Sequence, residues 1–270
     1  IEKTIKAGAT DCDVVLAKGF SKSISYRLGK VEDIEESNGS TFGIRALIGN
    51  KQAFISSSDD DENNIDKLIK RLIQMTKLAP EDETACLGDP NLYEKEITNL
   101  NLVQNNPTDT TKLIDMAKQC EESALEIKGI TNSEGSGSSF SESEFFIANN
   151  KGFSGGYRSS TNSISCSVIA GEGQLMERDY DYAVSRHIDD LDSPSEVGKS
   201  SAKKPIQRLN PRKIESCKTP VIFDKRISDD LIGYLASAVS GNSIARGTSF
   251  LKDSLNKQIF SKDINIIDDP

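Results

Sequence analysis

The sequence contains a single histidine, His187, among its 270 residues. A zinc site of the HExxH type needs two imidazoles, so this chain cannot build one from its own residues. Asp189 and Asp190 follow the histidine closely, but a catalytic triad is assembled in space and not by adjacency in sequence. No Gly-x-Ser-x-Gly elbow occurs either. We therefore expect His187 to be a surface or hydrogen-bonding residue, and we assign no catalytic residue.

Phosphate-binding loops are also missing. No glycine run leads into Gly-Lys-Ser or Gly-Lys-Thr, and the stretch at 135–139 lacks a lysine and a following helix, so it predicts a flexible bend. The stretch Gly171-Glu172-Gly173 is not a dinucleotide-binding loop, because position 176 is Met176 and Glu172 repels a pyrophosphate. It predicts a bend between strands.

Paired cysteines are absent as well. The five cysteines are scattered and form no CxxC motif: Cys12, Cys86, Cys120, Cys166 and Cys217. This spacing excludes a Cys/His zinc cluster and favours reduced thiols in a cytoplasmic protein. No metal ligand is therefore assigned in this chain.

The chain has no apolar run near the roughly 18 residues that a membrane span needs. The N-terminus has no apolar segment of a secretory signal, and a first residue Ile1 in place of Met indicates a fragment or a trimmed product. The net charge is −9, from 33 basic and 42 acidic residues. This charge argues against direct nucleic-acid binding, since the one basic cluster, 203–213, is typical of a solvated helix face.

Residues 1–80 are expected to be β-rich and to end in a helix. Short strands are predicted at 13–19, 21–37 and 41–57, punctuated by Gly19, Gly29, Gly39 and Gly49. Hairpin tips are predicted at Gly29 and within 48–52. Apolar residues at helical spacing follow from Ile65 to Leu78, with acidic residues 59–62 at the helix N-terminus and Pro80 as the stop.

The central part of the chain is expected to begin with a linker or ordered crossover at 80–107. A helix is predicted from Asn106-Pro107 to Gly129, and three or four antiparallel strands follow within 130–185. Ser193 is a predicted N-cap for a helix from Pro194 to about Leu209.

The last part of the chain predicts a strand at 219–225, a helix at 228–241 and a second strand pattern at 257–270 with nothing after it to pair. The predicted fold class is therefore α+β. Two N-terminal α/β modules with mixed or antiparallel sheets, 1–80 and 81–214, precede the start of a β-rich C-terminal domain at 215–270. We expect that domain to be truncated at Pro270.

Four stretches resemble a known family. Residues 156–198, 208–224 and 240–260 look like the PmbA (TldE) branch of the TldD/PmbA metallopeptidase family, and 29–57 is similar to its N-terminal module. The block RGTSFLKDSLNKQIF (246–260) is the most specific, and the resemblance runs over nearly the whole chain. It implies a cytoplasmic proteolytic system for peptide maturation or turnover.

In that family TldD-type subunits carry a zinc site with an HExxxH helix and a later cysteine, and PmbA-type subunits pair with them. The segment before RGTSF here, 229–245, contains no histidine and no glutamate. The resemblance thus implies a non-metal subunit of a heterodimer, with zinc on a TldD-like partner and none in this chain. The implied substrate is a peptide or an unfolded protein segment. The residues expected to face it, or the subunit interface, are Arg178, Asp179, Tyr180, Arg246, Thr248, Ser249 and Gln258.

Whether such a chain counts as an enzyme in its own right stays open at this point. The alternative function is a non-enzymatic protein-binding modulator of a DNA-associated partner such as gyrase, an idea attached to the family's name. A third alternative is an inactive gene remnant. Salt-dependent DNA binding favours the modulator, and partner-dependent peptide cleavage favours the peptidase subunit.

Overall fold

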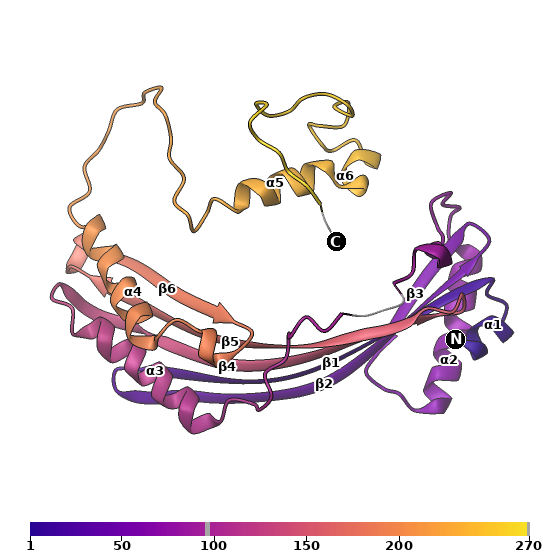
Figure 1. Cartoon of the computed structure of the whole chain (residues 1–270), viewed down its shortest axis with the longest axis horizontal. Coiled ribbons are helices and arrows are strands. Elements are labelled where there is room, and N and C mark those ends of the chain that lie inside the picture. The colour runs from indigo at the N-terminus through magenta and orange to yellow at the C-terminus, as the bar shows by residue number, and fades with distance from the viewer. Residues whose placement is uncertain (95–97, 269–270) are drawn as a thin grey trace. The chain divides into compact units, whose positions relative to one another are not determined.

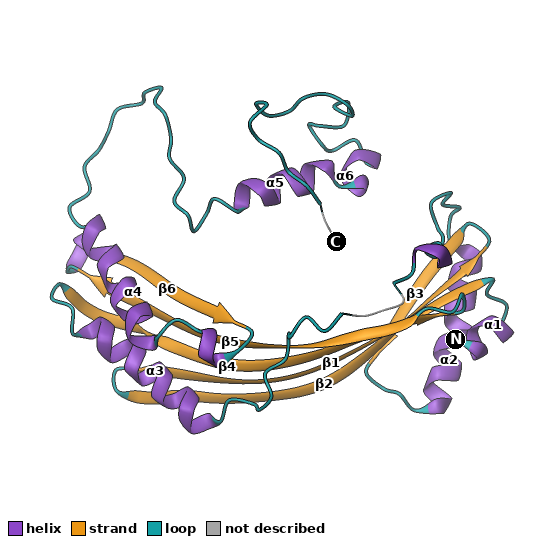
Figure 2. Cartoon of the chain, viewed as in Figure 1, coloured by secondary structure: helices purple, strands orange, loops and turns teal. Residues whose placement is uncertain are grey.

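The computed structural model describes residues 1–94 and 98–268, which form two compact units at 1–211 and 212–270. Figure 1 shows the first unit as a long, curved sheet with helices at both of its ends. The sheet has six antiparallel strands in the order β3-β2-β1-β4-β5-β6. Helices and strands both contribute to this unit (Figure 2), so the predicted α+β class is confirmed.

Two hairpins open the sheet. Strands β1 (Asp11–Arg27), β2 (Lys30–Ile48) and β3 (Lys51–Ser57) are joined by turns at the predicted tips, where Gly29 and Gly49 have φ values of 81° and 56°. Gly19 and Gly39 were expected to separate short strands, and this is wrong. They pair with each other inside β1 and β2, and Gly19 is also paired with Ser143 of β4, because a glycine stays extended where a neighbouring strand supplies hydrogen bonds.

The longer helices of the first unit begin at acidic or hydroxyl caps. After the short α1 (Glu2–Lys6), helix α2 (Glu62–Leu78) starts where the Asp61 carboxylate accepts hydrogen bonds from the amides of Asn63 and Asn64, as the acidic run predicts. Helix α4 (Pro194–Arg208) starts at the predicted cap, since the Ser193 hydroxyl accepts from the Glu196 amide. None of the described helices is long and apolar enough to cross a membrane.

Helix α3 (Thr110–Leu125) starts later than predicted. The cap is Asp109, whose carboxylate accepts a hydrogen bond from the Lys112 amide, and not Asn106. Lys112 is the third residue of the helix, and its backbone amide has no partner within the helix. The Asp109 carboxylate supplies that partner, whereas Asn106 does not. Among the described residues between α2 and α3 there is one 3-10 turn, η1 (Pro90–Leu92).

Strands β4 (Ile130–Asn149), β5 (Ser154–Ala170) and β6 (Glu177–Ser185) complete the sheet. A bend with the short η2 (Gly173–Leu175) joins β5 to β6, as the Gly171-Glu172-Gly173 stretch predicts. Strand β1 pairs with β4 over fourteen positions from Asp13–Asn149 to Tyr26–Ser136. The strands of the two expected N-terminal modules therefore lie in one continuous sheet.

All four helices of this unit cover the same face of the sheet. Alternate residues of β1 point to one side, and of these Cys12 packs against α2 while Ile24 and Tyr26 pack against α3. Helices α3 and α4 pack on Ile164, Cys166 and Val168 of β5. The opposite side, which we call the open face, carries none of the described helices of the first unit, and this leaves its side chains available for contacts.

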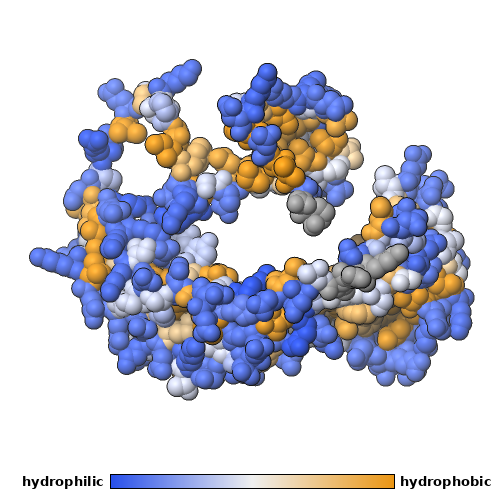
Figure 3. Space-filling model, in the orientation of Figure 1, coloured by the Kyte–Doolittle hydropathy of each residue, from blue (hydrophilic) through white to orange (hydrophobic). Residues whose placement is uncertain are grey.

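The second unit contains α5 (Asp230–Val239) and α6 (Gly241–Ala245) and no strand among its described residues. The strands predicted at 219–225 and 257–270 are therefore wrong where described, since both stretches form loops and turns, and positions 269–270 lie outside the described residues. An extended apolar stretch becomes a strand only beside a partner strand, which the described part of this unit lacks. Figure 3 shows hydrophobic side chains gathered on the surface of this unit. The exposed apolar residues of the unit include Ile222, Phe250 and Leu255.

Candidate functional site

The open face is rich in hydroxyl groups. Alternation along β4 and β5 brings serines of the two strands together, and the hydroxyls of Ser139 and Ser163 lie 2.7 Å apart. The hydroxyls of Ser143 and Ser159 form a second cross-strand pair at 3.0 Å. These groups can exchange their hydrogen bonds with an incoming polar backbone, because a hydroxyl both donates and accepts.

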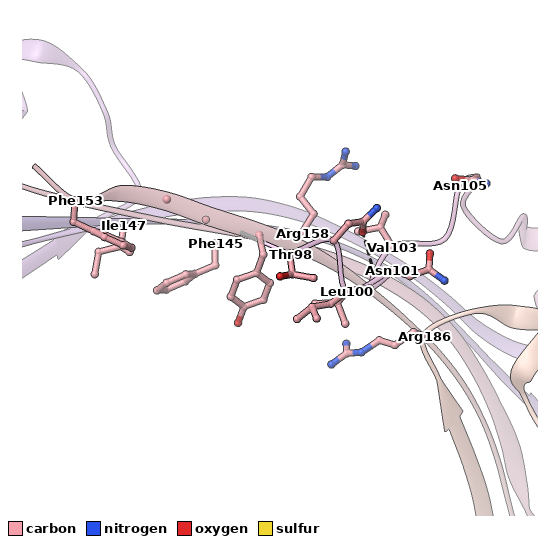
Figure 4. A pocket seen from close by; sticks show the side chains of 15 residues that line it. Thr98, Leu100, Asn101, Val103, Asn105, Phe145, Ile147, Phe153, Arg158 and Arg186 are labelled. Atoms are coloured by element: carbon pink, nitrogen blue, oxygen red, sulfur yellow. Dashed lines mark hydrogen bonds between the residues drawn. The ribbon is translucent and has the colours of Figure 1, made fainter. Parts of the chain in front are cut away.

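A groove of about 860 Å³ lies where the open face meets the crossover segment 98–105. Its floor consists of the apolar side chains of Phe145, Ile147, Phe153 and Tyr157, from β4, β5 and the turn between them. The rings of Phe145 and Tyr157 lie 6.0 Å apart. Figure 4 shows Leu100 and Val103 of the segment beside this floor. The volume lies within the range of roughly 300–1,000 Å³ that is typical of ligand sites.

The wall of the groove is held by hydrogen bonds from β5 and from the loop after β6. The amide of Ser160 donates to the Leu102 carbonyl at 2.9 Å, and the Gln104 amide donates to the Ser160 hydroxyl at 2.8 Å. The imidazole of His187 donates to the Asn101 carbonyl at 2.7 Å. This contact confirms the hydrogen-bonding role that we predicted for the only histidine.

A buried side-chain amide, that of Asn162, fixes the end of segment 98–105 by hydrogen bonds. The Asn162 side chain is fully buried, donates to the Gln104 side-chain oxygen at 3.0 Å, and accepts from the Thr108 hydroxyl at 2.8 Å. The same Gln104 oxygen accepts the Ile188 amide at 2.8 Å. Segment 98–105 is thus an ordered part of the sheet edge, as the predicted ordered crossover requires.

The groove lining is positively charged in a chain of net charge −9. Its described residues include Arg158 and Arg186 and no aspartate or glutamate. Figure 4 shows Arg186 on the same side of the strands as Phe145, and Arg158 on the other side. Arg158 is ion-paired with Glu142, whereas no carboxylate of the described residues is ion-paired with Arg186. Arg186 is therefore the cation that the groove presents.

The structure separates the three predicted site residues of β6. Arg178 and Tyr180 lie on the open face, where Arg178 contacts the Glu134 carboxylate at 3.3 Å and Tyr180 stacks on Tyr182 at 6.3 Å. Asp179 points to the helix-covered face, is nearly fully buried, and lies 3.3 Å from Arg208 of α4. Arg178 and Tyr180 can therefore contact a ligand that binds on the open face. Asp179 instead forms an ion pair that fixes α4 against the sheet.

The four predicted residues of the second unit lie around α5 and α6. The buried Ser249 hydroxyl donates to the Ala238 carbonyl at 2.6 Å, and the Thr248 hydroxyl donates to the Ser243 carbonyl at 3.3 Å. The Gln258 amide donates to the Phe260 carbonyl at 2.7 Å, while Arg246 is exposed at the end of α6. Three of the four side chains thus stabilise their own loops, and their contact with a substrate stays a prediction.

The side chains that could hold a metal ion are dispersed in the part of the chain that the structure describes. Over residues 1–94 and 98–268 no group of three or more histidine, cysteine, aspartate or glutamate side chains is placed to hold a metal. The buried cysteines belong to the core: hydrogen bonding with Cys166 and burial both raise the pKa of the Cys120 thiol, so it stays protonated. No metal-dependent step is therefore assigned to these residues.

Sequence reasoning missed the groove. It treated 80–107 only as a connection, and it did not select Phe145, Tyr157 or Arg186. The available signal was the aromatic pair at 145–146 followed by Tyr157 on the next strand, interrupted by small residues. Their common position depends on the β4–β5 register, which pairs Phe145 with Tyr157 and which a single sequence does not determine.

Comparison with protein-family models gives three matches along the chain. Residues 12–76 match PmbA/TldA metallopeptidase domain 1, 105–209 match the PmbA/TldA metallopeptidase central domain, and 216–270 match the PmbA/TldA metallopeptidase C-terminal domain. The Metalloprotease PmbA homolog of Haemophilus influenzae is 34% identical over 271 residues, which cover 100% of this chain and 60% of that protein. Metalloprotease PmbA of Escherichia coli O157:H7 is 32% identical over 268 residues, 98% of this chain and 60% of that protein.

Solved structures share the fold. A candidate modulator of DNA gyrase from Bacteroides thetaiotaomicron superimposes with a TM-score of 0.86 at 24% identity, covering 95% of this chain and 59% of that one. TldE from Thermococcus kodakarensis gives a TM-score of 0.72 at 17% identity, covering 94% and 57%. The chain thus spans about 60% of the length of the curated relatives that it matches.

Proposed function

Because the chain belongs to the PmbA/TldD metallopeptidase family, in its PmbA (TldE) branch, we propose that it is the substrate-holding, non-metal subunit of a two-subunit peptidase. Its partner is a TldD-like subunit that carries the zinc ion and cleaves the peptide bond. The complex processes peptides or unfolded protein segments in the cytoplasm, in proteolysis or peptide maturation.

The observation that carries this proposal is the open face with its apolar groove. An extended peptide exposes alternating side chains and a backbone that needs hydrogen bonds. The hydroxyl rows of β4 and β5 supply polar partners, and the floor around Phe145 and Tyr157 supplies apolar contact. This arrangement suits the binding of an unfolded segment and contains no nucleophile paired with a base.

The sequence supports a zinc site on the partner and substrate binding by this subunit. The family's metal-binding helix corresponds to 229–245 here, a segment without histidine or glutamate, and the chain's one histidine fastens the groove wall. Zinc chemistry then comes from the partner, where it lowers the pKa of a bound water and polarises the peptide carbonyl. This subunit contributes the grip on the substrate and the enclosure of the site.

The test is a cleavage assay with the complete protein that carries this chain, a TldD-type subunit, and the two mixed. An unstructured peptide should be cut only by the mixture, and a chelator should abolish the cleavage. Elemental analysis of the separate subunits should place zinc on the partner. Cleavage by this subunit with the partner rigorously absent overturns the proposal. Salt-dependent DNA binding without any cleavage supports the modulator alternative instead.

A further inference from the structure

We propose that the groove beside segment 98–105 binds the C-terminal end of a peptide, with a large apolar last side chain on its floor and the terminal carboxylate at Arg186. This inference rests on the proposed function and specifies which part of the peptide this subunit recognises. It concerns a different region from Arg178 and Tyr180, the residues on the open face of β6 that the sequence singled out.

The charge of the groove favours an anionic ligand. Among the lining residues that the structure describes, the groove presents one guanidinium without an ion pair, that of Arg186, and no carboxylate. One nitrogen of Arg186, Nη1, is anchored by the Ser160 carbonyl at 3.2 Å and the Thr161 hydroxyl at 3.1 Å. Those two bonds fix the direction of the side chain and leave other N–H groups for a ligand. A carboxylate is the acceptor that matches a guanidinium in two parallel hydrogen bonds.

The floor of the groove favours an apolar side chain. Phe145, Ile147 and Tyr157 form a surface on which an apolar side chain is removed from water. Phe145 and Tyr157 are both exposed in the absence of a ligand, at 37% and 56% of their surface, so the floor is accessible. A ligand that satisfies both features carries an apolar group and a carboxylate close together.

The position of Arg186 relative to the apolar floor favours a chain terminus over an internal residue. Figure 4 shows Phe153, Ile147 and Phe145 in a row, with Arg186 past the Phe145 end of that row. The last residue of a peptide carries its carboxylate and its side chain on the same Cα atom, so both reach their sites at the end of the groove. An internal aspartate or glutamate supplies the charge with its own side chain and leaves the apolar floor to a neighbour. The arrangement therefore favours a chain terminus.

The experiment measures binding of N-terminally labelled tetrapeptides to the chain by fluorescence anisotropy. The probes are Ala-Ala-Ala-Phe with a free carboxylate, the same peptide as an amide, Ala-Ala-Ala-Ala with a free carboxylate, and an amide with an internal aspartate. We expect the Phe acid to bind at least roughly tenfold more tightly than each of the others, the difference that a paired charge makes.

The variants separate the two contacts. Arg186→Gln should remove the preference for the acid over the amide, and Arg186→Lys should keep part of it because the charge remains. Tyr157→Ala should weaken the Phe peptides and leave the Ala peptide unchanged. Arg71→Gln is the control, since Arg71 is an exposed arginine of helix α2 and does not line the groove. It should change the affinities less than about twofold.

Equal binding of the acid and the amide overturns this inference and leaves the peptide grip of the proposed function standing. An acid preference that survives Arg186→Gln in a folded variant overturns the role of Arg186. If no peptide binds in any form, the inference is wrong, and the cleavage assay with the partner still decides the proposed function separately.

Discussion

The imidazole Nε2 of His187 lies 2.7 Å from the backbone carbonyl oxygen of Asn101. A carbonyl oxygen only accepts, so this nitrogen carries the proton and donates it. The contact joins the loop after β6 to the wall of the groove across 86 residues of sequence. The single histidine of the chain therefore has a positional role.

His187→Leu should loosen that wall while His187→Gln, which keeps a donor, should not. We expect the leucine variant to lose about 1 kcal/mol of unfolding free energy and to bind peptides a few-fold more weakly, the cost of one hydrogen bond. Urea denaturation and the anisotropy assay measure both. Cleavage in the presence of the partner should stay within a few-fold for His187→Gln. A loss beyond roughly a hundredfold indicates a general base and contradicts this view.

Asn162→Leu should destabilise the first unit strongly. The substitution keeps the volume but removes the acceptor of the buried Thr108 hydroxyl and one of the two donors to the Gln104 side-chain oxygen. We expect a loss of about 2–4 kcal/mol in urea denaturation. Ser163→Ala on the same strand is the control, because its partner Ser139 is still reached by solvent, and it should cost less than about 1 kcal/mol. Equal effects of the two variants contradict the locking role of Asn162.

Gly198→Ala tests the close approach of α4 to α3. A Cβ atom there would lie 2.1 Å from the carbonyl oxygen of Cys120, which belongs to the α3 backbone and cannot move aside alone. The helices must separate, at a cost of about 1–3 kcal/mol of unfolding free energy. Gly19→Ala is the control, since nothing lies within 4 Å of its Cβ position. A thermal denaturation midpoint that is unchanged in Gly198→Ala shows that the helices tolerate the separation.

Two of the five cysteines should react quickly with iodoacetamide in the folded protein. Cys86 and Cys217 are exposed, whereas Cys12, Cys120 and Cys166 are buried. Burial raises the pKa of the Cys12 thiol, which lowers the fraction of the reactive thiolate further. Peptide mass mapping after short labelling should find the label at the two exposed positions. Rapid labelling of Cys120 before unfolding is incompatible with this core.

Asp181 should make the stability of the first unit depend on pH. Burial raises the pKa of its carboxyl, but hydrogen bonds from Ser200 and Lys204 lower it more, so the pKa in the folded state lies below its usual value. The stabilisation is therefore present above the unfolded pKa of about 4 and is lost as the pH falls through the folded pKa. The Lys204 ammonium lies 2.9 Å away.

The variants Asp181→Asn and Lys204→Met should each be less stable than the parent at pH 7, by about 1–2 kcal/mol. The difference should shrink as the pH falls below 4, and urea denaturation at a series of pH values measures it. A difference that stays constant down to the lowest pH contradicts the pairing.

The parts of the fold that sequence predicts well are governed by local interactions. The hairpin tips at Gly29 and Gly49 need positive φ, and Asp61 and Ser193 cap the helices that follow them. These features depend on a few neighbouring residues. They are therefore visible in one sequence.

The parts that it misses depend on distant partners. Gly19 remains inside a strand because β2 and β4 flank it, and the stretch 219–225 remains a loop although its composition favours a strand. The same applies to the site, where Arg178 and Asp179 are neighbours in sequence and point to opposite faces. The groove is assembled from three separated segments, so it needs the strand register before its residues can be recognised.

The pairing of β1 with β4 also has a consequence for synthesis of the protein. The paired residues are separated by 110 to 136 positions, from Tyr26–Ser136 to Asp13–Asn149. At a ribosomal rate of about 5–20 residues per second, β4 is synthesised roughly 5–30 s after β1. The edge of β1 that pairs with β4 stays unpaired for that time. During that interval the first hairpins expose an unpaired row of backbone groups, which is the structure that recruits other nascent chains. The hydroxyl, lysine and glycine residues from 18 to 23 on that edge are well suited to keeping it soluble until β4 arrives.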